Sequence, residues 1–149
     1  MNTLKKELPK RFTDAVSKLY NAFHKGELNA LDCEHCAVGN MCNNDGGWME
    51  VNSGLNSRPI PKKYEKITGY NIFELNTIET LFMFGVRKAR LEMSGHFASD
   101  GTTESQFKGL CAVIEYLCEL DNIPNIMEYK SLFETENNTP KIELSEVFI

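Results

Sequence analysis

The sequence predicts an all-α fold, and three observations support this class. Apolar residues recur every three or four positions along most of the chain, the spacing that gives a helix one buried face. Capping residues precede several of these segments, and no strong alternating pattern of a strand is present. The chain of 149 residues has the size of one domain. We therefore expect a single helical domain over residues 1–149, with about five helices and a long irregular connection in its first half.

The first helix is expected over residues 8–24, and Gly26 follows it as a stop signal. Its apolar positions have helical spacing: Leu8, Phe12, Ala15, Val16, Leu19, Tyr20 and Phe23. A short second helix is expected to begin at Cys33 with Asp32 as its N-cap and to end at Gly39. Residues 43–70 are rich in turn-forming residues, so we expect an ordered connection there, with a short hairpin around Trp48.

Three further helices are expected over residues 71–91, 103–121 and 125–133. Each opens with the spacing of a capping box, a reciprocal pair of side chain-to-backbone hydrogen bonds: Asn71-x-x-Glu74, Thr103-x-x-Gln106 and Asn125-x-x-Glu128. Four glutamates of these helices are expected on solvated faces: Glu74, Glu79, Glu115 and Glu119. Residues 137–149 alternate weakly, which is compatible with a strand, a docking peptide or a flexible tail.

Composition excludes several classes of protein. The net charge is -5 and the lysines are scattered, so the chain lacks the basic face of a nucleic-acid-binding protein. No apolar run approaches the length of a membrane span, and the first residues lack the apolar core of a signal peptide, so no membrane insertion is expected. An odd number of cysteines, five, argues against a disulfide framework. We expect a cytoplasmic protein, and its charge is compatible with a neutral or basic protein partner.

The segment between Asp32 and Cys42 contains three of the five cysteines and carries the main functional signal. Cys33 and Cys36 have the C-x2-C spacing that lets two thiolates bind one ion from a single turn, as in zinc and iron–sulfur sites. On a helix both would point to one side, at its positive end. This pair predicts half of a metal site.

The remaining ligands must come from elsewhere in the chain. Cys118 is the strongest distant candidate, because it lies near the end of an amphipathic helix. Cys42 and His24 compete for the fourth position, although His24 is equally typical of a histidine that binds the carbonyls of a helix C-terminus. Cys111 shares the apolar face of Cys118 and is expected in the core.

These features predict a small metal-binding protein that holds zinc or an iron–sulfur cluster in a structural, electron-carrying or regulatory role. No phosphate-binding loop, nucleophile elbow or HExxH pattern points to an enzyme. Two alternatives stay open: a metal-free helical protein-interaction module, and a thiol redox protein that uses Cys33 and Cys36.

Three stretches, Leu19–His24, Cys36–Asn40 and Cys118–Asn125, resemble a small uncharacterised family from Bacteroidota that is often labelled as a component of the Na+-translocating NADH-quinone reductase. That label implies a plant-type ferredoxin fused to a flavin and nicotinamide reductase. The chain departs from this pattern, because C-x2-C comes first and no dinucleotide-binding glycine fingerprint is present. The resemblance does place His24, Cys33, Cys36 and Cys118 in or beside the shared stretches.

Overall fold

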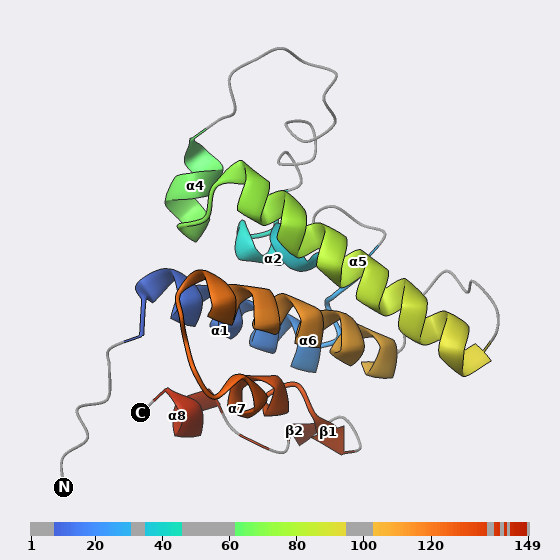
Figure 1. The fold of residues 1–149 in the computed structure, drawn as a ribbon. Helices are drawn as coiled ribbons and strands as arrows, with labels where there is room; N and C mark the ends of the chain where they lie inside the picture. The colour runs from blue at the N-terminus through green and yellow to red at the C-terminus, as the bar shows by residue number, and fades with distance from the viewer. Residues whose placement is uncertain are drawn as a thin grey trace, which may run out of the picture.

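The computed structural model describes residues 8–30, 35–45, 62–94, 103–136, 139–140, 142 and 144–148. Within these ranges the protein is an all-α fold, as the sequence predicts (Figure 1). The elements are α1 (Lys10–His24), α2 (Ala37–Met41), α4 (Lys63–Thr68), α5 (Ile72–Ser94), α6 (Thr103–Leu120), α7 (Ile126–Ser131), β1 (Thr135–Glu136), β2 (Thr139–Pro140) and α8 (Leu144–Val147). The two strands form one short antiparallel ladder, in which Thr135 lies opposite Pro140. No helix in these ranges is both long enough and apolar enough to span a bilayer.

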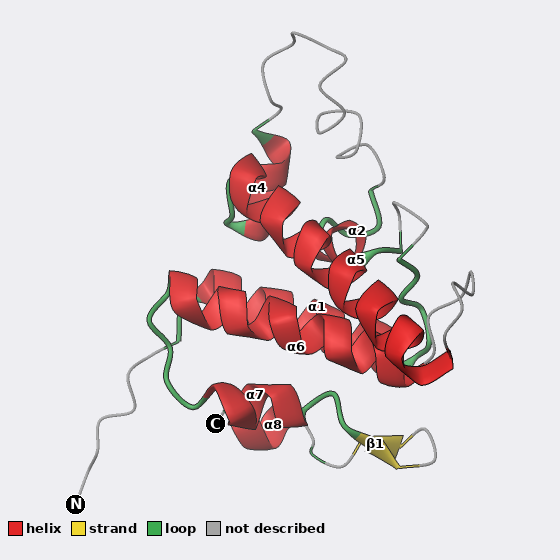
Figure 2. Ribbon diagram, turned by 45° about the vertical axis from the view of Figure 1, so that its right-hand side comes forward, coloured by secondary structure: helices red, strands yellow, loops and turns green. Residues whose placement is uncertain are grey.

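The helices form three levels, which Figure 2 shows from the side. Helix α4 and the start of α5 lie at the top, α5 slopes down toward the start of α6, α1 and α6 lie in the middle, and α7 and α8 lie below them. The long helices α5 and α6 run antiparallel and make the most extensive contact in the fold. The short helix α2 packs against both α1 and α5. This places the start of α2, and with it Cys36, beside the inner face of α5.

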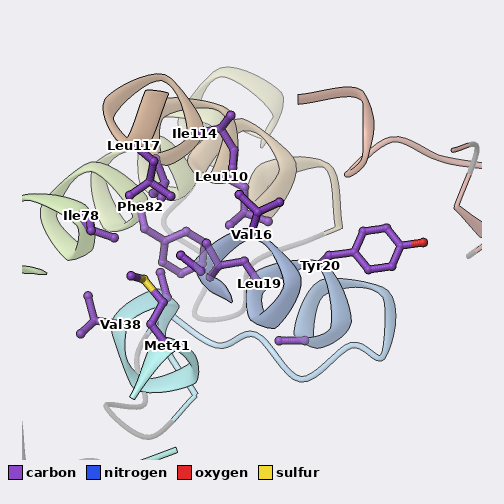
Figure 3. Close-up of a cluster of buried hydrophobic side chains, with 14 of the residues drawn as sticks. Val16, Leu19, Tyr20, Val38, Met41, Ile78, Phe82, Leu110, Ile114 and Leu117 are labelled. Atoms are coloured by element: carbon purple, nitrogen blue, oxygen red, sulfur yellow. The ribbon is translucent and has the colours of Figure 1, made fainter. Parts of the chain in front are cut away.

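Side chains from four helices fill the centre of the molecule (Figure 3). They are Val16 and Leu19 from α1, Val38 and Met41 from α2, Ile78 and Phe82 from α5, and Leu110, Ile114 and Leu117 from α6, whereas the ring of Tyr20 from α1 points away from them toward Phe133. All are buried, and most have no exposed surface. The apolar spacing in the sequence therefore predicts the buried faces correctly, because each face meets a neighbouring helix.

Two of the expected helix boundaries are confirmed by their hydrogen bonds or backbone angles. Asn71 and Glu74 form a true capping box: the Asn71 N–H donates to Glu74 Oε1, and the Glu74 N–H donates to Asn71 Oδ1, both at 2.9 Å. Gly26 follows α1 with a φ of +71°, a left-handed conformation that glycine adopts without steric cost. These two signals act locally, which is why the sequence shows them plainly.

Of the other two expected capping boxes, the one at Asn125 is not formed, and the one at Thr103 involves a side chain that lies outside the described part of the structure. The Gln106 side-chain amide donates to the carbonyl oxygen of Leu28 at 2.8 Å, so it ties α6 to the connection after α1. Asn125 precedes α7 with a φ of 64° and makes no side-chain cap. The spacing at Asn125 therefore does not produce a capping box, because its backbone is left-handed.

The irregular connection predicted before residue 71 contains a helix that the sequence did not indicate, α4. It ends at Gly69, whose φ is +79°. The expected hairpin around Trp48 lies outside the described residues. At the other end of the chain, Val147 of α8 and Phe148, which follows it, are partly buried against the core. The Phe148 ring lies 6.5 Å from the Tyr129 ring, so residues 144–148 are docked onto the domain.

Arg11 joins three parts of the fold at one end of α1. Its Nε donates to Asp121 Oδ2 at 3.0 Å and its Nη2 donates to Asp121 Oδ1 at 2.6 Å. Its Nη1 donates to the Gly69 carbonyl oxygen at 3.1 Å, and the guanidinium lies 4.5 Å from the centre of the Tyr70 ring. Any Cβ on residue 69 would lie 2.6 Å from the Arg11 Cβ, so glycine is required there for space as well as for its backbone angle.

Helices α5 and α6 touch through their backbones at Gly85 and Gly109. A Cβ added at Gly85 would lie 2.5 Å from the Gly109 Cα, and one added at Gly109 would lie 2.7 Å from the Phe82 carbonyl oxygen. Both distances are too short for real atoms, and the atoms in the way belong to the backbone, which cannot move aside. The spacing of α5 and α6 therefore depends on having glycine at both positions.

We predict that Gly85→Ala lowers the free energy of unfolding by about 2 kcal/mol, because overpacking outweighs the gain of about 0.5–1 kcal/mol in helix propensity. Denaturant unfolding followed by circular dichroism measures the difference. Arg87→Ala on the exposed side of the same helix is the control and should change stability by less than about 0.5 kcal/mol. A Gly85→Ala protein as stable as the wild type would show that the two helices are free to separate.

Candidate functional site

Cys36 is the N-cap residue of α2 and is nearly fully buried, with 2% of its surface exposed. Its backbone is extended, with φ -71° and ψ 178°, so the helix begins one residue later, at Ala37. The sequence-based expectation that Cys36 would lie inside a helix starting at Cys33 is therefore wrong. Asp32 and Cys33 themselves lie outside the described residues. The cap position turns the sulfur back over the first turn of α2, where its Sγ accepts a hydrogen bond from the Gly39 N–H at 3.2 Å.

The turn that carries Cys36 is held by Asn40. This side chain is buried, and its Nδ2 donates to the carbonyl oxygens of His35 at 2.9 Å and Cys36 at 3.0 Å. The His35 carbonyl also accepts from the Asn29 N–H at 2.8 Å. These bonds fix the backbone on both sides of the Cys36 sulfur. The thiol is thus held in one position by the fold.

Glu79 of α5 is the polar group that faces this turn. It is 4% exposed, so the expectation that it lies on a solvated helix face is wrong. Its carboxyl group lies close to the Cys36 thiol and to the N–H groups of Ala37 and Val38, which all lower its pKa. The distances and angles from these three groups to the Glu79 oxygens do not meet the criteria of a hydrogen bond, so neither oxygen has a hydrogen-bond partner among the described residues. Burial dominates and raises the pKa of Glu79 to about 7.

A buried carboxylate without a partner is costly. Placing it in the interior loses its hydration, and the loss is recovered only by a proton, a cation or well-formed hydrogen bonds. The acid form would still leave an acceptor oxygen without a donor. The groups beside the Glu79 carboxyl are the N–H groups of Ala37 and Val38 and the thiol of Cys36, and of these only the thiol can bind a cation.

Cys42 lies at the opposite end of α2, where it is the C-cap residue and is fully buried. At the rise of an α-helix the two caps are roughly 9 Å apart along the axis. Burial raises the pKa of Cys42 to about 12, and the nearby charges belong to Lys18, Asp45 and Lys63. Its surroundings are therefore those of a neutral thiol, and they do not overlap with those of Cys36.

Cys118 and His24 lie toward opposite ends of the paired helices α1 and α6. Cys118 is buried one turn before Asp121, the partner of Arg11, and burial raises its pKa to about 11. Arg11 and His24 are roughly 20 Å apart along α1, so His24 and Cys118 are separated by more than about 10 Å. Two ligands of one zinc ion each lie within roughly 2.3 Å of it, so these two residues do not share an ion here.

His24 is placed to bind a helix end. Its Nε2 is 2.7 Å from the carbonyl oxygen of Leu132, the C-cap residue of α7. Because a carbonyl only accepts, Nε2 must carry the hydrogen. The ring packs edge-on against Tyr20 and Phe23. The carbonyl-binding interpretation of His24 thus matches the structure, with the difference that the carbonyl belongs to another helix.

Within the part of the chain that the structure describes, no three side chains of His, Cys, Asp or Glu converge on one point. The structure separates Cys42 from Cys36 and His24 from Cys118, and it brings together Cys36 and Glu79. Glu79 was missed, although its spacing could have revealed it. It shares a helical face with Leu75, Ile78 and Phe82, all fully buried, and a glutamate at the centre of an apolar stripe is unlike one on a solvated face.

No protein-family model matches this chain, and no curated protein or solved structure is significantly similar to it. The resemblance to the Bacteroidota family therefore stays a prediction. The function has to be argued from the residues around Cys36 and Glu79.

We predict that the metal-free protein loses stability as the pH rises from about 5 to 8. The folded protein binds the Glu79 proton with a pKa of about 7, above the ordinary value of 4.5, so it holds more protons than the unfolded chain between these values. The free energy of unfolding then falls across this window by up to about 3 kcal/mol from this group alone. Denaturant unfolding in the presence of a chelator, at a series of pH values, measures it.

Glu79→Gln isolates this contribution, because glutamine keeps the shape and cannot ionise. The variant should exceed the wild type in stability by about 2–3 kcal/mol at pH 8 and differ little at pH 5. A difference between the two proteins that does not change with pH would mean that the carboxyl group finds a partner after all.

Proposed function

We propose that the protein binds a metal, zinc or an iron–sulfur cluster, through the C-x2-C pair Cys33 and Cys36. The observation that carries the proposal is the Cys36 sulfur, which is buried, fixed in place and hydrogen-bonded by a backbone N–H beside a carboxyl group that lacks a partner among the described residues. Cys33 is included in the proposed site only because of the C-x2-C motif.

The residues around Cys36 fit a bound cation. An N–H donor to the sulfur stabilises the thiolate, the form that binds metals, and such donors accompany metal-bound cysteines. The oxygens of Glu79, which have no hydrogen-bond partner in the described chain, add negative charge to the same place. A bound metal would supply a positive charge that compensates both groups and joins the segment before α2 to the core.

A structural or regulatory role follows from the position of the pair. Cys36 lies between the connection that leaves α1 and the helix α2, which packs on α1 and α5. Holding this point fixes how the chain crosses from one helix to the other. A role in electron transfer would require that the bound metal is an iron–sulfur cluster, which is one of the two metals in this proposal. A thiolate site of this kind is compatible with the reducing cytoplasm.

Burial makes the thiol redox alternative less favourable. Thiol–disulfide exchange needs a thiolate that other molecules can reach, and Cys36 is 2% exposed. The interaction-module alternative has one observation in its favour. Phe73 and Phe84 are exposed by 78% and 67%, and they lie about three helical turns apart on one face of α5. A protein partner would cover that face, whether or not the chain binds metal.

We predict that Cys36→Ser loses the metal, because removing one thiolate leaves an open and weakly held ion. Elemental analysis and a visible spectrum of protein purified without oxygen give the metal content and its kind. Cys111→Ala, which truncates a half-buried thiol of α6, should keep the metal and serves as the matched control. Full occupancy in Cys36→Ser would refute the proposal.

Single variants of the other predicted ligands complete the test. Cys42→Ser, Cys118→Ala and His24→Ala should each keep the metal, since the proposed site uses Cys33 and Cys36 and needs none of these three residues. Metal loss in any one of them, in a protein that still folds, would restore that residue to the site.

A further inference from the structure

We propose that Glu79 is itself a ligand of this metal, and that with Cys36 it makes a mixed oxygen and sulfur site suited to Zn²⁺. The inference rests on the proposed function, which requires only the cysteine pair. It assigns a ligand from α5, a helix that no sequence motif connects with the cysteines.

The first argument is the burial and orientation of the carboxyl group. Both oxygens are enclosed, both lack a hydrogen-bond partner among the described residues, and both lie at the turn that presents the Cys36 sulfur. A glutamate retained only for packing would be replaced at no loss by an apolar residue, since its neighbours Leu75, Ile78 and Phe82 are fully buried. A cation bound by both Cys36 and Glu79 would compensate the buried carboxylate.

The second argument is how firmly the fold holds the two groups. Asn40 fixes the turn of Cys36 through two hydrogen bonds, and the glycine contact with α6 fixes α5. The Asn71–Glu74 capping box secures the start of the same helix. Two donors on separate, rigid elements are what a metal site needs, because the ion then meets ligands already in position.

The ligand types decide between the two metals left open. Zinc accepts sulfur, nitrogen and carboxylate oxygen in a tetrahedral site. Iron–sulfur clusters are held by thiolates, and Cys42 lies at the opposite end of α2 from Cys36. A carboxylate beside Cys36 therefore favours a single Zn²⁺ ion.

The test is a titration of the full-length, metal-free protein with Zn²⁺, and with Co²⁺ as its coloured substitute. In the wild type, Co²⁺ should give a sulfur-to-cobalt charge-transfer band and the visible bands of a tetrahedral site. In Glu79→Gln the charge-transfer band should persist, the visible bands should shift, and Zn²⁺ should bind at least tenfold more weakly. Glu119→Gln makes the same chemical change at an exposed glutamate of α6, so it is the matched control and should bind both metals as the wild type does.

The outcomes separate this inference from the proposed function. If Glu79→Gln binds both metals with unchanged affinity and spectrum while Cys36→Ser loses them, the cysteine site stands and Glu79 is not a ligand. If Cys36→Ser also binds normally, both proposals fall. A wild-type protein purified with iron and a cluster spectrum that Glu79→Gln leaves unchanged would likewise overturn the zinc assignment.

Folding of the variant is checked in the same samples. Zn²⁺ should raise the melting temperature of the wild type and of Glu119→Gln more than that of Glu79→Gln. An equal rise in all three proteins would show that the ion gains nothing from the carboxylate and would overturn the assignment of Glu79.

Discussion

The close contact of α5 and α6 at Gly85 and Gly109 is the constraint on which the rest of the structure depends. Because neither position has room for a Cβ, the two longest helices of the described chain meet backbone to backbone. The contact sets the depth at which α5 sits in the core, and therefore which of its side chains are buried. Phe82, Val86 and Glu79 lie inside for this reason, and α2 packs against the face that α5 presents.

The buried Glu79 is a member of this core whose burial opposes folding. Its apolar neighbours gain free energy when they leave water, whereas an ionised carboxyl group without a partner loses it. The fold tolerates the loss because α5 is secured at its start by the capping box and at its middle by the glycine contact. Such a residue is typical of a functional site, where a side chain needed for binding or catalysis lowers the folding stability.

The cysteines differ by their surroundings more than by their burial. Cys36 has a backbone N–H directed at its sulfur. Cys42 and Cys118 are equally buried, but burial dominates their surroundings and raises the pKa of each, which favours the neutral thiol. Cys36 is thus set apart by the N–H donor at its sulfur and by the Glu79 carboxyl group beside it. The sequence pattern alone predicts Cys118 as a metal ligand together with Cys36.

The sequence by itself determined the elements whose signals are local: the apolar faces of α1, α5 and α6, the stop at Gly26 and the capping box at Asn71. It also marked Cys36 as chemically distinct through the C-x2-C spacing. Only the tertiary structure decided which groups meet, because side chains such as Gln106 and His24 bind carbonyl oxygens of distant elements. It likewise showed that Glu79 faces Cys36 and that Cys118 does not lie with His24, since such meetings depend on how helices pack and not on the order of residues along the chain.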